Sequence, residues 1–172
     1  MARNPKDTAI SYYHHNIHLN GYTGTREDFL NAFIEGKVLF SPFNEHVLEF
    51  WKIRNQPNVL FLFYEDMKRN LQNEVRKTMK FLEKDYSDEQ IDKLCDHLSV
   101  DSMRKNPSCN FEEIQMMIRN SGVIDESVDK FTFIRKGQVG SGNEELTEKE
   151  NKRFDDYANH PEFEAYGFAY KS

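Results

Sequence analysis

Val59-Leu60-Phe61-Leu62-Phe63-Tyr64 is a continuous apolar run of strand length, and it follows the turn-like segment Asn55-Gln56-Pro57-Asn58. A strand that is apolar on both faces is typical of a parallel sheet with helices on each side. The chain turns polar at Glu65 and Asp66, and in open α/β sheets ligands bind at the carboxyl ends of the strands. The run therefore predicts an α/β fold with the Tyr64 hydroxyl at the ligand-binding edge, although a core tyrosine with one satisfied hydrogen bond is an equally good interpretation.

Outside this run, helix signals dominate the chain. Asn4 can serve as an N-cap, with Pro5 at the first helical position. Residues 102–110, which contain an Asn-Pro pair, are predicted to form a loop, residues 111–118 a short helix, and the aromatic tail after residue 162 is expected to pack on the body. Further predicted helices begin at Thr25, Ser41, Ser87 and Thr147.

The composition is that of a folded globular protein. The 172 residues, of which 38% are hydrophobic, are enough for one domain with a sizeable core. A formal net charge of −6 does not suit general nucleic-acid binding, which depends on neutralising many phosphates. Cys95 and Cys109 cannot form a disulfide framework and, like the six histidines, show no metal-ligand spacing, so no metal and a reduced, cytoplasmic setting are expected. The sequence shows neither a secretory segment nor a run of about 18 apolar residues that could span a membrane.

A glycine-rich loop with two leading cations, Arg135-Lys136-Gly137-Gln138-Val139-Gly140-Ser141-Gly142, is a candidate anion-binding site. Glycine lets backbone N–H groups approach a ligand, and arginine offers a planar fork of donors that matches phosphate oxygens. By itself the signal is weak, because most such loops are solvated connections. Arg3 and Ser11 could meet at a shared phosphate, but Ser11 lies roughly 10 Å along the helix from its N-cap. Spacing alone therefore favours a locally paired arginine and an ordinary polar serine.

Four motifs of the chain resemble those of cytosolic sulfotransferases and occur in the family's order. Arg3-Asn4-Pro5-Lys6-Asp7-Thr8-Ala9-Ile10-Ser11-Tyr12-Tyr13 is similar to R-N-P-K-D-x-A-x-S-Y-Y, and Phe63-Tyr64-Glu65-Asp66-Met67-Lys68 to F-Y-E-D-M-K. Met103-Arg104-Lys105-Asn106-Pro107 is similar to M-K-x-N-P, and Phe133-Ile134-Arg135-Lys136-Gly137-Gln138-Val139-Gly140 to F-x-R-K-G-x-x-G. The motifs extend through essentially the whole chain, which corresponds to the C-terminal half or so of the family.

The resemblance implies an α/β fold, namely a P-loop-like three-layer sandwich around a parallel sheet, helix-rich and incomplete because only its C-terminal part is present. Residues 1–172 would form one partial sulfotransferase domain. Such proteins bind 3′-phosphoadenosine 5′-phosphosulfate (PAPS), or its product adenosine 3′,5′-bisphosphate (PAP), and transfer the sulfonate to a hydroxyl or amine. The predicted strand at residues 59–64 should then lack some of its neighbours, and apolar helix faces should be uncovered.

The resemblance also assigns residues to the cofactor. Arg3 and Ser11 would hold the 3′-phosphate from one side and the loop that starts at Arg135 would hold it from the other. Tyr64 would contact the adenine region, and residues 98–103 would line the adenine pocket, partly by backbone. The assigned cofactor-binding residues are Arg3, Ser11, Tyr64, Leu98, Ser99, Val100, Met103, Phe133, Ile134, Arg135, Lys136 and Gly137.

The chain departs from the family in ways that bear on activity. It contains no segment like Y-P-K-S-G-T-T-W, whose lysine neutralises charge on the leaving group, and none of its six histidines corresponds to the family's catalytic histidine. Sulfonate transfer needs a base for the acceptor and positive charge at the bridging oxygen. The resemblance therefore assigns no catalytic residue, and the isolated chain is expected not to transfer sulfonate. A non-catalytic nucleotide-binding or partner-binding fragment is the alternative.

Smaller departures concern the adenine pocket and the partners. Val100 replaces a phenylalanine that stacks on the adenine, and Ser141-Gly142-Asn143 replaces D-W-K after the loop. Of the dimer segment K-x-x-x-T-V-x-x-x-E only Thr147 is kept, so the family's homodimer is doubtful. The expected partner is a small acceptor, with phenols, alcohols, steroids, retinoids and amines all open, and neither nucleic acid nor a membrane is expected.

Overall fold

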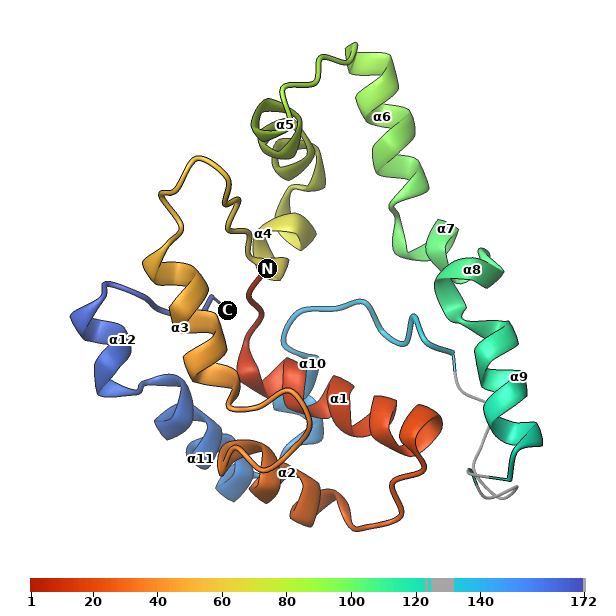
Figure 1. The fold of residues 1–172 in the computed structure, drawn as a ribbon, viewed down its shortest axis with the longest axis vertical. Helices are drawn as coiled ribbons and strands as arrows, with labels where there is room; N and C mark the ends of the chain where they lie inside the picture. Colours follow the sequence, from red (N-terminus) through yellow and green to blue (C-terminus); the bar gives the residue numbers. More distant parts are fainter. Residues whose placement is uncertain (123, 125–131, 172) are drawn as a thin grey trace.

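A computed structural model of the chain describes residues 1–122, 124 and 132–171. These residues form twelve helices (Figure 1). Lys130 and Phe131, which precede the motif that begins at Phe133 by a few residues, lie outside the described residues. The helices are α1 (Pro5–Asn20), α2 (Arg26–Ile34), α3 (Phe43–Lys52), α4 (Tyr64–Arg69), α5 (Leu71–Phe81), α6 (Asp88–His97), α7 (Val100–Arg104), α8 (Pro107–Asn110), α9 (Glu112–Asn120), α10 (Ser141–Glu145), α11 (Glu148–Ala158) and α12 (Pro161–Ala165).

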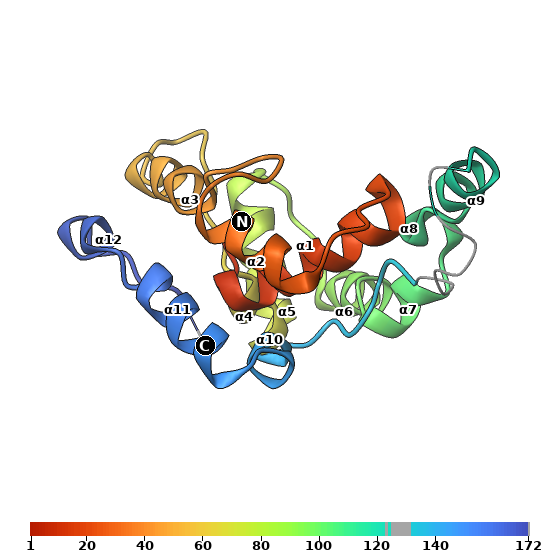
Figure 2. The same ribbon diagram turned by 90° about the horizontal axis from the view of Figure 1, so that it is seen from below.

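Helix α1 lies in the middle of the molecule. Both views place α9 and α12 on opposite sides of it (Figures 1 and 2). Ala9 and Ile10 of α1 pack against Leu30 and Phe33 of α2 and against Phe154 of α11, and all five side chains are buried. Burying apolar surface of this kind contributes about 25 cal/mol per Å², so this cluster holds the N-terminal half of α1 in place.

The predicted helix starts are confirmed at Asn4, Thr25, Ser87 and Thr147, because each side chain accepts a hydrogen bond from a backbone N–H of the first turn. Such caps satisfy donors that have no partner inside the helix. The helix expected near Ser41 begins two residues later, with α3. The helix expected over residues 111–118 is present as α9.

The predicted strand at residues 59–64 is not formed as a strand. In the described part of the chain, this run makes one parallel bridge, between Phe63 and Ala2. The Ala2 N–H donates to the Leu62 carbonyl at 2.8 Å, and the Tyr64 N–H donates to the Ala2 carbonyl at 2.9 Å. A strand needs a neighbouring extended segment along its length, and here the neighbour is a single residue. The expected shortage of strand neighbours is therefore present, and the three-layer sandwich is not seen among the described residues.

The run is held instead by aromatic packing. The Phe63 ring lies 6.0 Å from that of Phe168 and 6.1 Å from that of Trp51, and the Phe61 ring lies 5.3 Å from Trp51. The Phe63–Phe168 pair is stacked and the two pairs with Trp51 are edge-to-face, and aromatic pairs of either kind contribute about 0.5–1.5 kcal/mol each beyond burial. Phe163 and Phe168 of the tail are buried in the same cluster, which confirms that the aromatic tail packs on the body.

The loop predicted for residues 102–110 is wrong, because these residues belong mostly to the short helices α7 and α8. Each begins at a capping side chain, since Ser99 accepts a hydrogen bond from Ser102 N and Asn106 accepts one from Ser108 N. Pro107 then occupies the first position of α8, where its missing N–H costs nothing. The Asn-Pro pair thus starts a helix rather than a turn.

Apolar side chains are uncovered on helix α9, in line with the expectation of uncovered helix faces, and also at Phe40 between α2 and α3. Phe40, Met116 and Met117 are strongly exposed. No described helix combines the length and the apolar character needed to cross a membrane. Within residues 1–122, 124 and 132–171, no group of three or more His, Cys, Asp or Glu side chains could hold a metal ion.

Candidate nucleotide-binding site

A cavity of about 190 Å³ lies where the start of α1, helix α7 and the Arg135 loop meet. It brings together all the cofactor-binding residues assigned from the sequence except Leu98 and Ser99, and it adds Ser141. The lining residues are Arg3, Ser11, Tyr64, Val100, Met103, Phe133, Ile134, Arg135, Lys136, Gly137 and Ser141. The sequence spacing that disfavoured a meeting of Arg3 and Ser11 therefore does not prevent the two from sharing one cavity.

The start of α1 positions Arg3. The Asn4 N–H donates to Glu65 Oε1 at 2.8 Å, which ties this segment to α4, and the Glu65 side chain is buried. Arg3 Nη2 donates to the Gln138 carbonyl at 3.2 Å, and its guanidinium lies 4.3 Å from the centre of the Tyr64 ring. The buried Arg3 Nε has no hydrogen-bond partner among the described residues. Arg3 is thus held at the cavity with one donor still unsatisfied.

Tyr64 begins α4 and faces the cavity beneath Arg3. Burial raises the pKa of the Tyr64 phenol above its usual value, and the nearby Arg3 only partly offsets this effect. The phenol is therefore neutral at neutral pH and offers a hydroxyl and an aromatic face rather than a charge.

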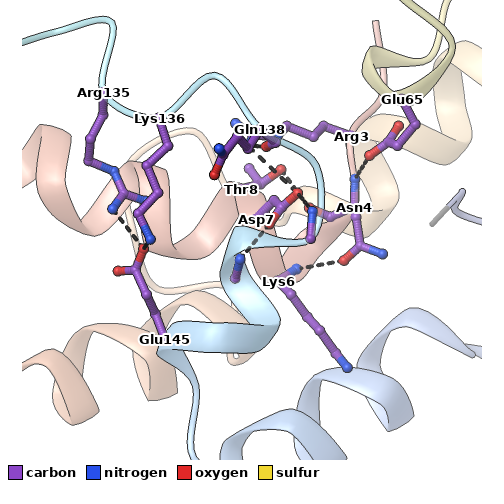
Figure 3. A network of polar contacts seen from close by, with 12 residues as sticks. Arg3, Asn4, Lys6, Asp7, Thr8, Glu65, Arg135, Lys136, Gln138 and Glu145 are labelled. Atoms are coloured by element: carbon purple, nitrogen blue, oxygen red, sulfur yellow. Dashed lines mark hydrogen bonds and ion pairs between the residues drawn. The ribbon is translucent and has the colours of Figure 1, made fainter. Parts of the chain in front are cut away.

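Asp7 fastens the glycine-rich loop to the first turn of α1 (Figure 3). Its Oδ2 accepts a hydrogen bond from Gly140 N at 2.9 Å and its Oδ1 accepts one from Gly142 N at 2.6 Å. A Cβ at Gly142 would lie 2.7 Å from the backbone carbon of Lys6, so only glycine fits this close approach. The R-N-P-K-D motif therefore supplies both the Arg3 side chain and the anchor of the opposite loop.

Arg104 and Asn110 hold the loop from its other side. Arg104 donates from Nε to the Ile134 carbonyl at 3.1 Å, and from Nη2 to the carbonyls of Arg135 and Lys136. Asn110, which is buried, accepts from Ile134 N at 3.3 Å through Oδ1 and donates through Nδ2 to carbonyls of α7. A guanidinium can serve several carbonyls at once because its donors form a rigid fork.

Gly137 turns the loop sharply against α7. Its φ is +62°, and a Cβ there would lie 2.7 Å from Val100 Cγ2. Both the left-handed conformation and the close contact require glycine. The valine that replaces the family's phenylalanine thus sits directly beside the loop glycine.

Arg135 and Lys136 extend side by side toward Glu145 of α10 (Figure 3). Glu145 Oε1 lies 2.7 Å from Arg135 Nη1 and 2.8 Å from Lys136 Nζ. Burial alone would raise the pKa of Glu145, but the hydrogen bonds from Lys136 and Arg135 and their charges lower it to about 2. His14 Nε2 lies 3.6 Å from Glu145 Oε2, but burial and then the charge of Arg135 lower the His14 pKa, so the ring is neutral at neutral pH.

Two assigned residues lie outside the lining. Leu98 lines an apolar hollow between α5 and α6 together with Leu71, Val75 and Leu94. Ser99 caps α7, and its hydroxyl donates to Ser102 Oγ at 2.9 Å. Ser99 thus positions the helix that carries Val100 and Met103.

Two larger hollows differ in chemistry from this cavity. A hollow of about 300 Å³ between α3 and α11 is lined by Glu35, Glu45 and Glu162, which disfavours an anion. Another, of about 450 Å³, shares Arg3, Ser11 and Phe133 with the candidate site. Its remaining walls are mostly aromatic, from Tyr12, His15, Phe40 and Phe43.

The comparison with family models decides what kind of protein this is. Residues 1–166 match the model of the sulfotransferase domain. The chain belongs to the sulfotransferase family. Among curated relatives, this sulfotransferase chain is 39% identical to sulfotransferase 1B1 of Canis lupus familiaris over 90% of the chain and 51% of the relative. It is 35% identical to sulfotransferase 1C2 of Homo sapiens over 91% of the chain and 51% of the relative. The chain thus spans about half the length of the curated relatives it matches.

Solved structures of sulfotransferases share the fold. The chain matches retinol dehydratase in complex with retinol and PAP with a TM-score of 0.84 at 31% identity, covering 99% of this chain and 48% of that one. It matches retinol dehydratase in complex with androsterone and the inactive cofactor PAP with a TM-score of 0.81 at 33% identity, covering 92% and 45%. Sulfotransferases of this family use PAPS as the sulfonate donor.

Several residues that shape this candidate site were not predicted from the sequence. Asp7 and Arg104 belong to motifs that were recognised in the sequence. Their hydrogen bonds to the glycine-rich loop were not predicted. Glu145 lies three residues beyond the quoted loop, and nothing in its neighbourhood distinguishes it from the adjacent Glu144. The helix α10, which brings Glu145 beneath Arg135, was not predicted.

Proposed function

We propose that this chain is the nucleotide-clamping part of a sulfotransferase and that it binds the 3′-phosphate of PAPS or PAP in the cavity described above. The convergence of Arg3 and Ser11 from α1 with Arg135, Lys136 and Gly137 from the loop carries the proposal. These residues are 124 to 134 positions apart in the sequence. A phosphate dianion is best held by guanidinium, ammonium, hydroxyl and backbone N–H donors together, and this cavity supplies all four kinds.

The unsatisfied Nε of Arg3 supports the same reading. A buried donor without a partner costs about 1–3 kcal/mol, so a ligand oxygen that accepts from it would recover that cost. On the side toward α7, Tyr64, Val100, Met103 and Phe133 offer aromatic and aliphatic surface without charge. We assign this side to the adenine, whose flat face suits such contacts.

The activity of the whole protein is, on this proposal, transfer of a sulfonate from PAPS to a hydroxyl or amine of a small acceptor. The aromatic hollow that adjoins the site through Arg3 and Phe133 would suit a phenol, alcohol, steroid, retinoid or amine with an apolar body. Residues 1–172 would bind the nucleotide without transferring sulfonate, because no segment matches the family's lysine loop or catalytic histidine. Within the whole protein, residues 59–64 would complete a parallel sheet of the sandwich type. The cytoplasmic location and the doubtful homodimer stay predictions.

Binding of PAP to the 172-residue chain tests the proposal. In isothermal titration calorimetry, PAP should bind with saturation, and adenosine 5′-monophosphate, which lacks the 3′-phosphate, should bind at least about tenfold more weakly, or about 1.4 kcal/mol. Arg3→Ala should weaken PAP binding by a similar factor. Arg69→Ala is the matched control, because Arg69 is exposed and its ion pair with Asp66 lies outside the cavity. A folded chain that does not bind millimolar PAP would refute the proposal.

Catalysis is tested separately. The chain should transfer no radiolabelled sulfonate from PAPS to a phenol, a steroid alcohol or an arylamine above the rate without protein. Transfer above that background would overturn the proposed inactivity of residues 1–172, whereas saturable PAP binding without transfer would support a clamp that lacks the reacting groups.

A further inference from the structure

The two loop cations already have an anionic partner within the chain. Arg135 Nη1 and Lys136 Nζ both lie within 2.8 Å of the same carboxylate oxygen of Glu145. Glu144 adds a second carboxylate, 4.0 Å from Lys136 Nζ. Glu145 therefore already pairs with both positive charges before any ligand arrives, whereas Glu144 is 75% exposed and only reaches the edge of this contact. Arg3 is the further cation of the cavity, and the buried carboxylate of Asp7 lies 3.7 Å from it.

The backbone of Glu145 is fixed, so its carboxylate stays beside the clamp. Arg26 Nη1 donates to the Glu145 carbonyl at 2.6 Å, and Arg26 is held in turn by Glu150 at 3.1 Å. Leu146 N donates to the Gly142 carbonyl at 3.0 Å, which closes the last turn of α10. The start of the same helix is fastened to Asp7 through Gly142. Freeing Arg135 or Lys136 therefore requires side chains to rotate rather than α10 to move.

We propose that Glu145 competes with the 3′-phosphate for Arg135 and Lys136 and thereby sets the affinity of this chain for its nucleotide. The inference rests on the proposed function. Carboxylate and phosphate oxygens accept from the same donors of a guanidinium or an ammonium group. A nucleotide phosphate that recruits these cations must therefore break their bonds to Glu145, and part of its binding free energy is spent on that exchange.

Substitution of Glu145 tests the competition. We expect Glu145→Gln to tighten PAP binding by about tenfold in titration calorimetry, because the amide is uncharged and holds the two cations less strongly. Glu145→Ala should tighten it in the same direction, and it keeps the test decisive if the glutamine variant is poorly folded. Glu144→Gln is the matched control, because its carboxylate is 75% exposed and comes only within 4.0 Å of Lys136 Nζ, and it should change the affinity less than twofold.

A second ligand shows where the gain arises. Adenosine 5′-monophosphate lacks the 3′-phosphate, so its affinity should be the same for the wild type and for Glu145→Gln. An equal gain for both nucleotides would overturn competition at the 3′-phosphate, since it would indicate a general change in charge.

The remaining outcomes separate this inference from the proposed function. Equal PAP affinity of wild type and both Glu145 variants would overturn the competition and leave the nucleotide site standing. Weaker PAP binding by the variants would also overturn it, because Glu145 would then position the cations rather than occupy them. Absence of PAP binding in every folded variant would refute the nucleotide site and the competition together.

Discussion

The backbone N–H of Gly142 donates a 2.6 Å hydrogen bond to Oδ1 of Asp7, whose carboxylate is only 2% exposed. This contact joins a helix start to a loop 135 residues later in the chain. The same carboxylate also accepts from Gly140 N through Oδ2. Because both acceptor oxygens of Asp7 are used, the shape of the glycine-rich loop depends on a carboxylate at this position.

Replacing Asp7 with asparagine should therefore destabilise the chain by about 1–3 kcal/mol. Asparagine keeps one oxygen but turns an NH2 group toward the second backbone N–H, which leaves a buried donor unpaired. The change should appear as a lower free energy of unfolding in urea. Asp155→Asn is the control, since Asp155 pairs with Lys6 but is 59% exposed, and its loss should cost less than about 1 kcal/mol. Equal costs at the two positions would contradict the anchoring role of Asp7.

Local signals predicted much of this fold, and contacts between distant segments escaped prediction. The caps at Asn4 and Thr147 act within three residues of themselves, so the sequence alone reveals them. The capping side chains of Ser99 and Asn106 were equally visible, and the loop prediction for residues 102–110 gave too much weight to the Asn-Pro pair. The run at residues 59–64 has strand composition, but pairing depends on which segment lies beside it, and composition does not carry that information.

In the candidate site, too, recognisable motifs were predicted and contacts between separate segments were not. Apart from Ser141, the residues that line the cavity were assigned through resemblance to the family, which reflects a shared fold. The Arg135–Glu145 contact depends on the short helix α10 and on Arg26 holding its end, and neither follows from the spacing of residues near the loop. Ser11 illustrates the converse, because spacing alone disfavoured it and the fold nevertheless brings it to the cavity.

Gly137→Ala should be more damaging than Gly140→Ala, although both glycines have positive φ. A non-glycine residue in the left-handed region costs roughly 1–2 kcal/mol, and that cost applies at both positions. A Cβ at Gly137 would also lie 2.7 Å from Val100 Cγ2, whereas a Cβ at Gly140 would have no described atom within 4 Å. Overpacking of this kind adds about 1–3 kcal/mol. Thermal unfolding of the two variants measures the difference.

Adding Val100→Ala tests the cause. The second substitution should recover most of the excess cost in the Gly137→Ala background and none of the cost of Gly140→Ala, because it removes the atoms that clash. A double-mutant cycle without coupling between positions 137 and 100 would show that the left-handed conformation alone accounts for the loss.

Glu145 should make the stability of the unliganded chain depend on pH in the acid range. Its pKa is about 2 in the folded chain against a usual value of 4.5, so the folded state favours the ionised carboxylate. The resulting stabilisation is fully present above pH 4.5 and is lost as the pH falls toward 2. We expect the free energy of unfolding to exceed that of Glu145→Gln by about 1–2 kcal/mol at pH 6, which is less than the full shift implies because the carboxylate is 23% exposed and partly screened. The excess should shrink steadily as urea unfolding is repeated down to pH 3, while Glu144→Gln follows the wild type throughout.

If the Arg135 and Lys136 bonds stabilise the free chain in this way, the Glu145→Gln substitution that destabilises the chain should also strengthen PAP binding, because one interaction is responsible for both effects. A Glu145→Gln chain that kept the full pH dependence of the wild type would place the acid-sensitive group elsewhere.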